Sequence, residues 1–479
     1  MRGTQPAHMT MPPVWLASLQ ALVGTDQCET ESTRLQEYAV DGLIPSVVIR
    51  PETAEQVAAV LQWAQGEKLA VLPRGSGTAI RLGSMAQRCD IVLSTSRLTL
   101  ISEYDAANFT ITAGAGMTCS QLSQVTAVHR QLLPLQYPFS AATLGGLIAA
   151  NAYSPKRLLY GGVRDLLLGL RIALPSGEIA HFGGKVVKNV AGYDMCKLFV
   201  GSLGALGAVV EATFKLYALP ERDETLLAEF PSLEQGAAAV ARLSSTQLLP
   251  SQILLFNSTA SGALAPQSDV HIAAGAAALL VNCEGMDEAV ERQLADIAHI
   301  CQGHGASTVQ VLSGEAQLQL RQRLCPVTQN FAAHAVLPAA QPASVAGHGV
   351  ERDVLSARLG TLPSQVYTVM QAAVQALHPI APGVVIIGDC GVGLVTLCLR
   401  PDSLAVSALE TQLLPALREL RRLVVALGGY AVVDSASPAV KTLLEVWGST
   451  PSSFVLLKAL KDRFDPEGVL SPGRFIGGL

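Results

Sequence analysis

A glycine-rich turn that directly follows an apolar strand constrains this chain more than any other feature. Residues 69–72 have the pattern of a short buried strand. We expect Pro73 to end this strand, because proline lacks the amide hydrogen that a strand ladder needs. Gly75 and Gly77 then permit a tight turn at positive φ with no Cβ in the way. Such a turn directs successive N–H groups to one concave point, which suits a diphosphate; the alternative is an ordinary glycine turn.

The residues before this turn predict a β-α-β unit that delivers it at the carboxyl end of a strand. Residues 46–50 have a strand pattern, and Thr53 with a glutamine three residues later is typical of a helix start. The spacing excludes two common phosphate loops. Ile80 stands where a nicotinamide-binding Rossmann unit has its third glycine, and the Gly-Lys-Ser/Thr of a Walker loop is absent. The loop backbone, with the hydroxyls of Ser76 and Thr78, would therefore hold the diphosphate.

Composition excludes some classes of function. The chain has 479 residues, of which 49% are hydrophobic and 15% charged, so we expect a large core and about three average domains. The net charge of −5 and the 5% aromatic content argue against a nucleic-acid-binding protein.

The same survey indicates a cytoplasmic protein. Nine scattered cysteines without a Cys-x-x-Cys pair favour reduced thiols over disulfides, zinc or an iron–sulfur cluster. Residues 1–13 lack the apolar core of a signal peptide. The aliphatic run 272–281 is shorter than the roughly 18 residues that a membrane span needs. Any association with the inner face of a membrane would therefore be peripheral and indirect, through a partner.

Two later segments have the glycines of a ligand site. Thr143 is placed to cap a helix whose first turn holds Gly145 and Gly146, although each glycine costs a helix about 1 kcal/mol relative to alanine. An anion close to the helix N-terminus would compensate for that cost; the alternative is tight helix packing. Arg164 and Asp165 follow a glycine pair, where they either adjoin the ligand or pair with each other.

The segment 183–194 is the most unusual stretch, because glycines enclose two lysines, a tyrosine and an aspartate. It continues into Gly201, Gly204 and Gly207. We expect this three-residue spacing to let the backbone lie against a flat ring. Residues 209–216 then form the strand that closes the first domain.

The second half alternates apolar strands with helices rich in alanine and leucine. This pattern predicts an antiparallel sheet with helices on one face, an α+β cap. The expected strands are 226–230, 252–257, 277–282, 352–359, 384–387 and 393–399, and the expected helices are 233–243, 286–303, 365–377 and 409–427. Residues 331–349 are expected to be a loop. The histidines (His299, His304, His334, His348 and His378) form no His-x-His or His-Glu pair, so we expect no catalytic metal.

With these segments in view, the chain resembles the vanillyl-alcohol oxidase / p-cresol methylhydroxylase class of FAD enzymes. Within that class it is most similar to the FAD-binding subunit of bacterial glycolate oxidase. The motifs that carry the likeness are Tyr-Gly-Gly-Val-Arg-Asp (160–165), the lysine-rich segment 184–194, the glycine segment 201–207 and the C-terminal segment 465–475. The resemblance implies an α+β fold: a two-part FAD-binding domain of the p-cresol methylhydroxylase type at 1–220 (46–220 recognisable), a cap at 221–458, and a C-terminal segment, 459–479, that returns to the FAD-binding domain.

The resemblance also implies the contacts of FAD. Those expected at the diphosphate and the flavin are Pro73, Arg74, Gly75, Ser76, Gly77, Thr78, Pro138, Ala141, Thr143, Gly145, Gly146, Gly161, Arg164 and, on the adenine side, Val209. Relatives with covalent FAD often carry a histidine after the loop arginine. This loop has none, so we expect non-covalent, dissociable FAD.

The implied activity is that of an FAD-dependent oxidoreductase acting on CH–OH donors. A 2-hydroxy acid such as glycolate or lactate would become a 2-oxo acid, and electrons would pass to an iron–sulfur subunit in a complex that includes a second flavoprotein subunit. A base must take the hydroxyl proton. The catalytic candidates are Tyr193, Lys188 and Arg474. Their alternatives are a flavin-wall tyrosine, a solvated lysine and a surface ion pair.

Two other functions remain open. One is a stand-alone FAD-dependent alcohol or sugar-acid dehydrogenase. The other is an assembly subunit that holds FAD without its own turnover. Asp389 and Cys390 occupy a position where relatives often show a histidine–glycine motif. This difference favours the assembly role.

Overall fold

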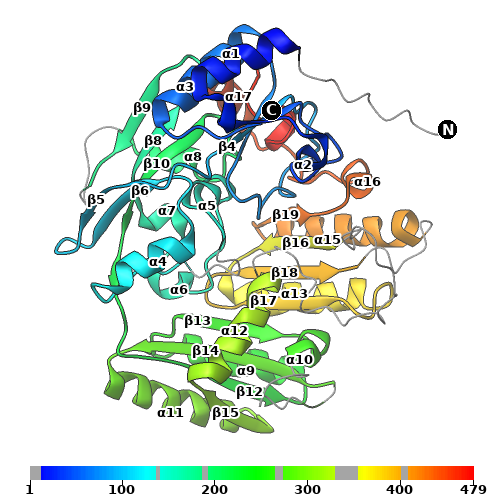
Figure 1. Cartoon of the computed structure of the whole chain (residues 1–479). Helices are drawn as coiled ribbons and strands as arrows, with labels where there is room; N and C mark the ends of the chain where they lie inside the picture. Colours follow the sequence, from blue (N-terminus) through cyan, green and yellow to red (C-terminus); the bar gives the residue numbers. More distant parts are fainter. Residues whose placement is uncertain are drawn as a thin grey trace.

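Three β-sheets organise the computed structural model of the chain. The structure describes residues 12–135, 141–185, 193–264, 273, 275–328, 354–400 and 408–479. Figure 1 shows two smaller sheets in the upper half of the molecule and the third sheet below them, with the C-terminal segment back at the top.

The first sheet carries the glycine-rich turn. Its strand order is β1-β2-β4-β3, and β2 and β3 both run parallel to β4. Helix α3 (Ala54–Gly66) connects β2 to β3, and the hydroxyl of Thr53 accepts a bond from the Gln56 amide at 3.1 Å, which confirms the predicted cap. The strands are β1 (Cys28–Glu29), β2 (Val47–Ile49), β3 (Val71–Arg74) and β4 (Ile91–Ser94).

The prediction that Pro73 ends this strand is wrong. Pro73 lies inside β3, in register with Leu93 of β4. Because β3 is the edge strand of the four-stranded sheet and its proline nitrogen faces away from β4, Pro73 removes no bond to β4.

The second sheet is antiparallel, with the order β5-β6-β10-β8-β9. Helix α5 (Leu144–Ala150) packs on β10 over a core that includes Phe199 and Phe214. The strands are β5 (Ile101–Asp105), β6 (Thr110–Gly114), β8 (Leu167–Ala173), β9 (Ile179–Gly183) and β10 (Ala208–Lys215); a separate pair joins β7 (Gln131–Leu132) to β11 (Tyr217–Ala218). The remaining helices of this half are α1 (Pro13–Val23), α2 (Ser32–Gln36), α4 (Cys119–Ala127), α6 (Arg157–Tyr160), α7 (Val163–Leu166) and α8 (Cys196–Phe199).

The third sheet is antiparallel, with the order β15-β12-β14-β13-β17-β18-β16-β19. Its strands are β12 (Arg222–Phe230), β13 (Gln252–Phe256), β14 (Ala277–Gly285), β15 (Thr308–Leu312), β16 (Leu355–Gly360), β17 (Val385–Asp389), β18 (Leu394–Leu399) and β19 (Tyr430–Ser435). Helices α9 (Leu233–Ser244), α11 (Asp287–Gly303), α13 (Val366–Leu377) and α15 (Leu414–Ala426) cover one face and enclose a large apolar core. The predicted α+β class is confirmed.

The expectation that helices cover only one face of this sheet is incomplete. Helices α10 (Ser258–Leu264) and α12 (Gly314–Thr328) pack on the opposite face of the sheet. There they enclose a second, smaller core around Phe256 and Leu280. The expected loop 331–349 lies outside the described residues.

The C-terminal segment returns to the first sheet. After α16 (Pro438–Lys441) and α17 (Phe454–Phe464), Leu470 forms a parallel bridge with Val71 of β3. The ammonium of Lys461, buried at the end of α17, donates to Asp465 at 2.5 Å and to the carbonyls of Ala205 and Leu470, each at 2.8 Å. This ammonium therefore has three acceptors and joins the segment to the second sheet.

Two further observations concern the described part of the chain. None of its helices combines the length and the apolar character that crossing a bilayer requires. The cysteines whose side chains are described there are free thiols.

The buried pair Lys461–Asp465 and the exposed pair Lys458–Asp462 have the same i,i+4 spacing on α17 and serve as matched variants. We expect Lys461→Met to lower the free energy of unfolding by about 3–5 kcal/mol, because it leaves the buried Asp465 charge without its partner. Lys458→Met should change it by less than about 1 kcal/mol. Chemical denaturation measures both, and equal effects would contradict the structural role given to Lys461.

Candidate functional site

A pocket forms where four separate parts of the chain meet. It encloses about 500 Å³, counting its open mouth. Its lining consists of residues 72–80 with Thr143, Gly146, Ala149, Ala150, Leu203 and Arg474. The structure therefore brings the predicted glycine loop, the predicted Thr143 segment and the predicted C-terminal arginine to one place.

The loop approaches the Thr143 segment so closely that only glycine fits at position 75. A Cβ built on Gly75 would lie 2.0 Å from the Thr143 hydroxyl oxygen. That oxygen accepts a bond from the Gly146 amide at 3.3 Å and caps α5, as predicted. Because α5 has only seven residues, we ascribe its part in the pocket to close backbone packing rather than to a helix dipole.

Arg74 explains the second glycine of the loop. Its guanidinium stacks on the Tyr38 ring at 4.5 Å, and Nη1 donates to the Glu37 carbonyl at 3.1 Å. A Cβ on Gly77 would come within 2.5 Å of this guanidinium, and Gly77 has a φ of +81° that side chains rarely adopt. The Arg74 guanidinium is therefore held in a fixed position beside the turn at Gly77.

Arg474 reaches the pocket from the C-terminal segment. Its side chain is buried, and Nη2 donates to the carbonyls of Ile80 at 2.7 Å and Leu82 at 2.6 Å. Its other terminal nitrogen, Nη1, is buried and has no hydrogen-bond partner in the described part of the chain. Burial lowers the pKa of Arg474, yet a guanidinium stays charged in proteins.

The donors and charges of this pocket fit the diphosphate of FAD. Its lining holds two arginines, two hydroxyl side chains in the loop and a glycine turn, and it includes no carboxylate. An unpaired buried cationic donor costs free energy until an acceptor reaches it. The pocket therefore suits a bound anion with several oxygens.

Other predicted contacts of the cofactor lie outside this lining. Gly145 packs against Ala115, and Val209 is buried in β10. Ala141 and Arg164 are exposed, and Pro138 lies outside the described residues. These residues stay predictions.

The neighbouring glycines serve turns. Asp165 accepts a bond from the Gly162 amide at 2.9 Å, so the carboxylate caps α7. Gly161 has a φ of +80°, and Gly201, Gly204 and Gly207 all have positive φ as well. A Cβ on Gly204 would approach the ring of Pro73. Each of the three glycines spaced by three residues, at 201, 204 and 207, thus lies where the backbone turns.

The catalytic candidates are not brought together in the described residues. Tyr193 is 93% exposed, whereas Arg474 is buried in the pocket. Lys188 lies outside the described residues. The alternative for Arg474, a surface ion pair, does not fit its burial at 3% exposure.

A buried pair joins the FAD-binding half to the cap. The Tyr153 hydroxyl donates to Asp389, at the end of β17, and the Gly391 amide donates to the same carboxyl group at 3.2 Å. Burial raises the pKa of Asp389 to about 6, although the bonds from Tyr153 and Gly391 oppose this shift. Leu158 packs against Gly391. The Tyr153 side chain thus occupies the space beside Asp389, at the position where relatives often show a histidine–glycine motif.

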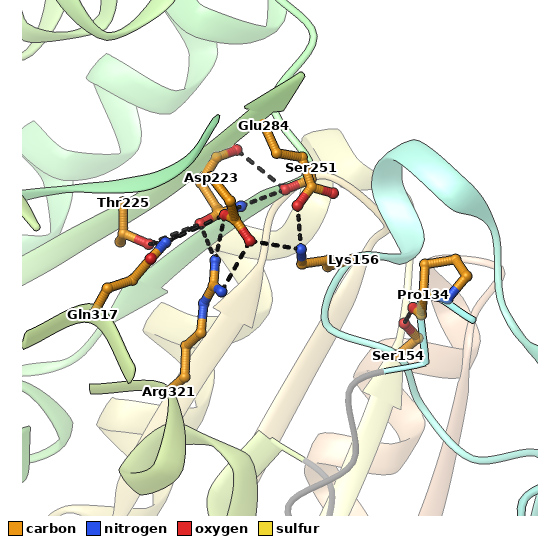
Figure 2. Close-up of polar contacts among 10 residues, drawn as sticks. Pro134, Ser154, Lys156, Asp223, Thr225, Ser251, Glu284, Gln317 and Arg321 are labelled. Carbon is orange, nitrogen blue, oxygen red and sulfur yellow. Dashed lines mark hydrogen bonds and ion pairs between the residues drawn. The ribbon is translucent and has the colours of Figure 1, made fainter. Parts of the chain in front are cut away.

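A second buried cluster lies along the same contact (Figure 2). Lys156 donates to Glu284 and, at 2.9 Å, to Asp223 of β12. Arg321 of α12 forms a bidentate pair with Asp223 at 3.0 and 2.6 Å. Burial acts to raise the pKa of Asp223, but Arg321 and Lys156 outweigh it and lower that pKa.

Sequence analysis missed this cluster. Lys156 precedes the Tyr160 motif by four residues, and its carboxylate partners come from strands far along the chain. No local pattern around Lys156 distinguishes it from a solvated lysine, because Ser154 and Arg157 flank it. The cluster fixes the segment before the Tyr-Gly-Gly-Val-Arg-Asp motif on the cap.

Metal binding has no support among the residues that the structure covers, since no group of three histidine, cysteine, aspartate or glutamate side chains is placed to hold an ion. His334 and His348 lie outside those residues.

Comparisons with known proteins show similarity to FAD-linked oxidoreductases. A family model described as an FAD binding domain matches residues 45–183, and a model described as FAD linked oxidases, C-terminal domain, matches residues 219–347. The D-lactate dehydrogenase of Archaeoglobus fulgidus is 29% identical over 90% of this chain and 92% of that protein. The glycolate oxidase subunit GlcD of Bacillus subtilis is 32% identical over 57% of this chain, but the match covers only 59% of that relative.

Solved structures support the fold. The crystal structure of p-cresol methylhydroxylase with substrate bound superimposes with a TM-score of 0.69 at 16% identity, over 96% of this chain and 95% of that one. This likeness confirms the predicted architecture of an FAD-binding part and a cap.

The first prediction from the pocket concerns Gly75. We expect Gly75→Ala to raise the Kd for FAD at least about tenfold, because the methyl group must displace Thr143 and with it the loop backbone. Gly66→Ala is the matched control, since nothing lies within 4 Å of its Cβ. Titration monitored by flavin fluorescence measures both, and an unchanged Kd for the Gly75 variant would contradict the close approach.

The second prediction concerns pH. Asp389 has a pKa of about 6 in the folded protein against an ordinary 3.8, so the folded state holds its proton to higher pH than the unfolded state. The raised pKa of Asp389 therefore stabilises the folded state below about pH 4. This stabilisation, about 3 kcal/mol in the free energy of unfolding, is lost as the pH rises to about 6.

Asp389→Asn should remove this slope relative to the unaltered protein, while Asp462→Asn, on the exposed face of α17, should keep it. Chemical denaturation at a series of pH values measures both. Identical slopes in the Asp389→Asn variant and the unaltered protein would refute the assignment.

Proposed function

Since this chain is an FAD-dependent oxidoreductase with an FAD-binding domain and an FAD-linked oxidase C-terminal domain, we propose that it oxidises a 2-hydroxy acid to a 2-oxo acid. Glycolate and lactate are the substrates we favour, because the relatives include a glycolate oxidase subunit and a D-lactate dehydrogenase. FAD supplies the hydride acceptor for this reaction when it is bound. The observation that carries the proposal is the pocket at residues 72–80, with its close backbone approach and its buried arginine.

In this proposal the chain's own residues bind and position the reactants. The backbone of residues 73–78, with Ser76 and Thr78, holds the diphosphate, and Thr143 keeps the adjoining segment in place. Tyr193 and Lys188, from the glycine-bounded segment 183–194, stay our candidates for accepting the hydroxyl proton. The division into a domain at 1–220, a cap at 221–458 and a returning segment at 459–479 stays part of the proposal.

We further propose that the chain works in a complex of the glycolate oxidase type, in the cytoplasm. A second flavoprotein subunit and an iron–sulfur subunit would be its partners, and the iron–sulfur subunit would take the electrons. The likeness to a glycolate oxidase subunit supports this arrangement. If the chain has no partners, the alternative is a stand-alone FAD-dependent dehydrogenase of an alcohol or a sugar acid.

One observation favours a second candidate function, an assembly subunit that holds FAD without turnover. Tyr153 donates to Asp389 in the buried contact between the two halves. A carboxyl group engaged in this way and raised in pKa is poorly suited to bind a cation or a substrate. The companion subunit would then perform the oxidation.

Anaerobic incubation of the purified FAD-loaded chain with glycolate, D-lactate, L-lactate and 2-hydroxyglutarate distinguishes these functions. Loss of the yellow flavin absorbance with one of these acids is the result that we expect. No loss alone, but turnover once co-expressed partner subunits are added, would establish the assembly role. Loss with simple alcohols or sugar acids but not with 2-hydroxy acids would establish the stand-alone dehydrogenase.

The mode of cofactor attachment gives a separate prediction. The loop from Arg74 to Ile80 offers no histidine for a covalent bond to the flavin. We expect acid precipitation of the loaded protein to leave all of the yellow colour in the supernatant. Colour that stays with the precipitated protein would show a covalent flavin.

A further inference from the structure

We infer that Arg474 is a binding residue for the FAD diphosphate, and that the C-terminal segment therefore completes the cofactor pocket. The inference rests on FAD as the cofactor and is independent of which hydroxy acid, if any, the chain oxidises. It replaces the expectation that Arg474 acts on the substrate.

The first argument is the unpaired donor. Arg474 is 3% exposed and lines the pocket, and its Nη1 has no hydrogen-bond partner among the residues that the structure describes. The carboxyl group of Asp41 is already engaged, because Lys441 donates to Oδ1 at 2.8 Å and the Ala86 amide donates to Oδ2 at 3.1 Å. A buried guanidinium that the protein leaves partly unpaired is a binding site for a ligand oxygen.

The second argument is the fixed orientation of the guanidinium. Nη2 donates to two carbonyls that follow the glycine turn, those of Ile80 and Leu82, so these bonds set the plane of the guanidinium. A planar group held on one side presents its remaining donors in a fixed direction, which favours phosphate oxygens over a mobile substrate. Lysine has no second nitrogen with which to copy this arrangement.

The third argument is the anchoring of the backbone. The carbonyl of Arg474 accepts bonds from the Ser84 amide at 3.0 Å and from the indole of Trp447 at 3.2 Å. A Cβ on Gly83 would lie 2.8 Å from that carbonyl oxygen, so the two segments pack without a gap. The Lys461 contacts hold the same segment further upstream. Arg474 is therefore placed by the tertiary structure before any cofactor arrives.

The test measures ligand affinity and needs no substrate. Kd values for FAD, ADP and riboflavin are determined for the unaltered chain, Arg474→Met and Arg474→Lys. The control is Arg418→Met, which removes an exposed arginine that also donates to a backbone carbonyl, that of Leu443. We expect Arg474→Met to weaken FAD and ADP by roughly ten- to hundredfold, the loss of one charge-assisted bond. Riboflavin, which lacks the diphosphate, should change by less than about twofold.

The other outcomes decide against the inference. An FAD affinity within about twofold of the unaltered chain would overturn it, and so would an equal loss for riboflavin, which would place Arg474 at the flavin ring. Should the methionine variant fail to fold, Arg474→Lys tests the same bond, with an expected loss of FAD and ADP affinity that spares riboflavin. ADP that fails to compete with FAD in the unaltered chain would also overturn it. Failure of every hydroxy acid to react leaves these affinities unaffected, so the two proposals fail separately.

Discussion

The architecture of the candidate site depends on one close contact, that between the backbone of Gly75 and the hydroxyl of Thr143. A single methyl group at position 75 would overlap that hydroxyl. The contact joins the first sheet, which delivers the glycine loop from β3, to the second sheet, on which α5 packs. A pocket assembled from two sheets in this way requires both to be held in a fixed relation.

Buried ion pairs and hydrogen bonds supply that relation at several points. Lys461 joins the C-terminal segment to the second sheet, Lys441 joins α16 to Asp41, and Lys156 joins the first half to the cap. Removing such charges from water costs nearly as much as their attraction returns, so pairs of this kind stabilise a protein weakly. Their value here is positional, because each has its partner in one arrangement of the chain only. Apolar cores on both sides of the cap sheet provide the bulk of the stability.

The contact between the two halves of the chain includes Asp389 and Cys390, at the position where the family resemblance implies a histidine–glycine motif. Tyr153 and Asp389 occupy it with a bond that is shielded from water. The cofactor pocket and this contact therefore make different demands on the sequence. The pocket needs glycine and a buried arginine, whereas the contact needs a matched donor and acceptor. The residues that form the cofactor pocket are therefore different from those that form the contact between the halves.

Local patterns in the sequence determined most of the secondary structure and the loop. Thr53 and Thr143 cap helices as their spacing indicates. Apolar periodicity placed six of the eight strands of the cap sheet within a few residues, but it missed the two outermost strands, β15 and β19. These features depend on neighbours three or four residues away, which a sequence displays directly. Pro73 was misplaced because its tolerance depends on β3 being an edge strand, a property of the sheet order.

Only the tertiary structure decided the rest. The partners of Lys156 and Tyr153 stand 67 to 236 residues away along the chain, and the exposure of Tyr193 follows from packing that no local pattern records. The C-terminal motif indicated Arg474 as a candidate site residue. Its burial and its bonds to Ile80 and Leu82 result from the return of the C-terminal segment to the first sheet. The physical reason is that burial and charge pairing are set by segments that are distant in sequence and meet only on folding.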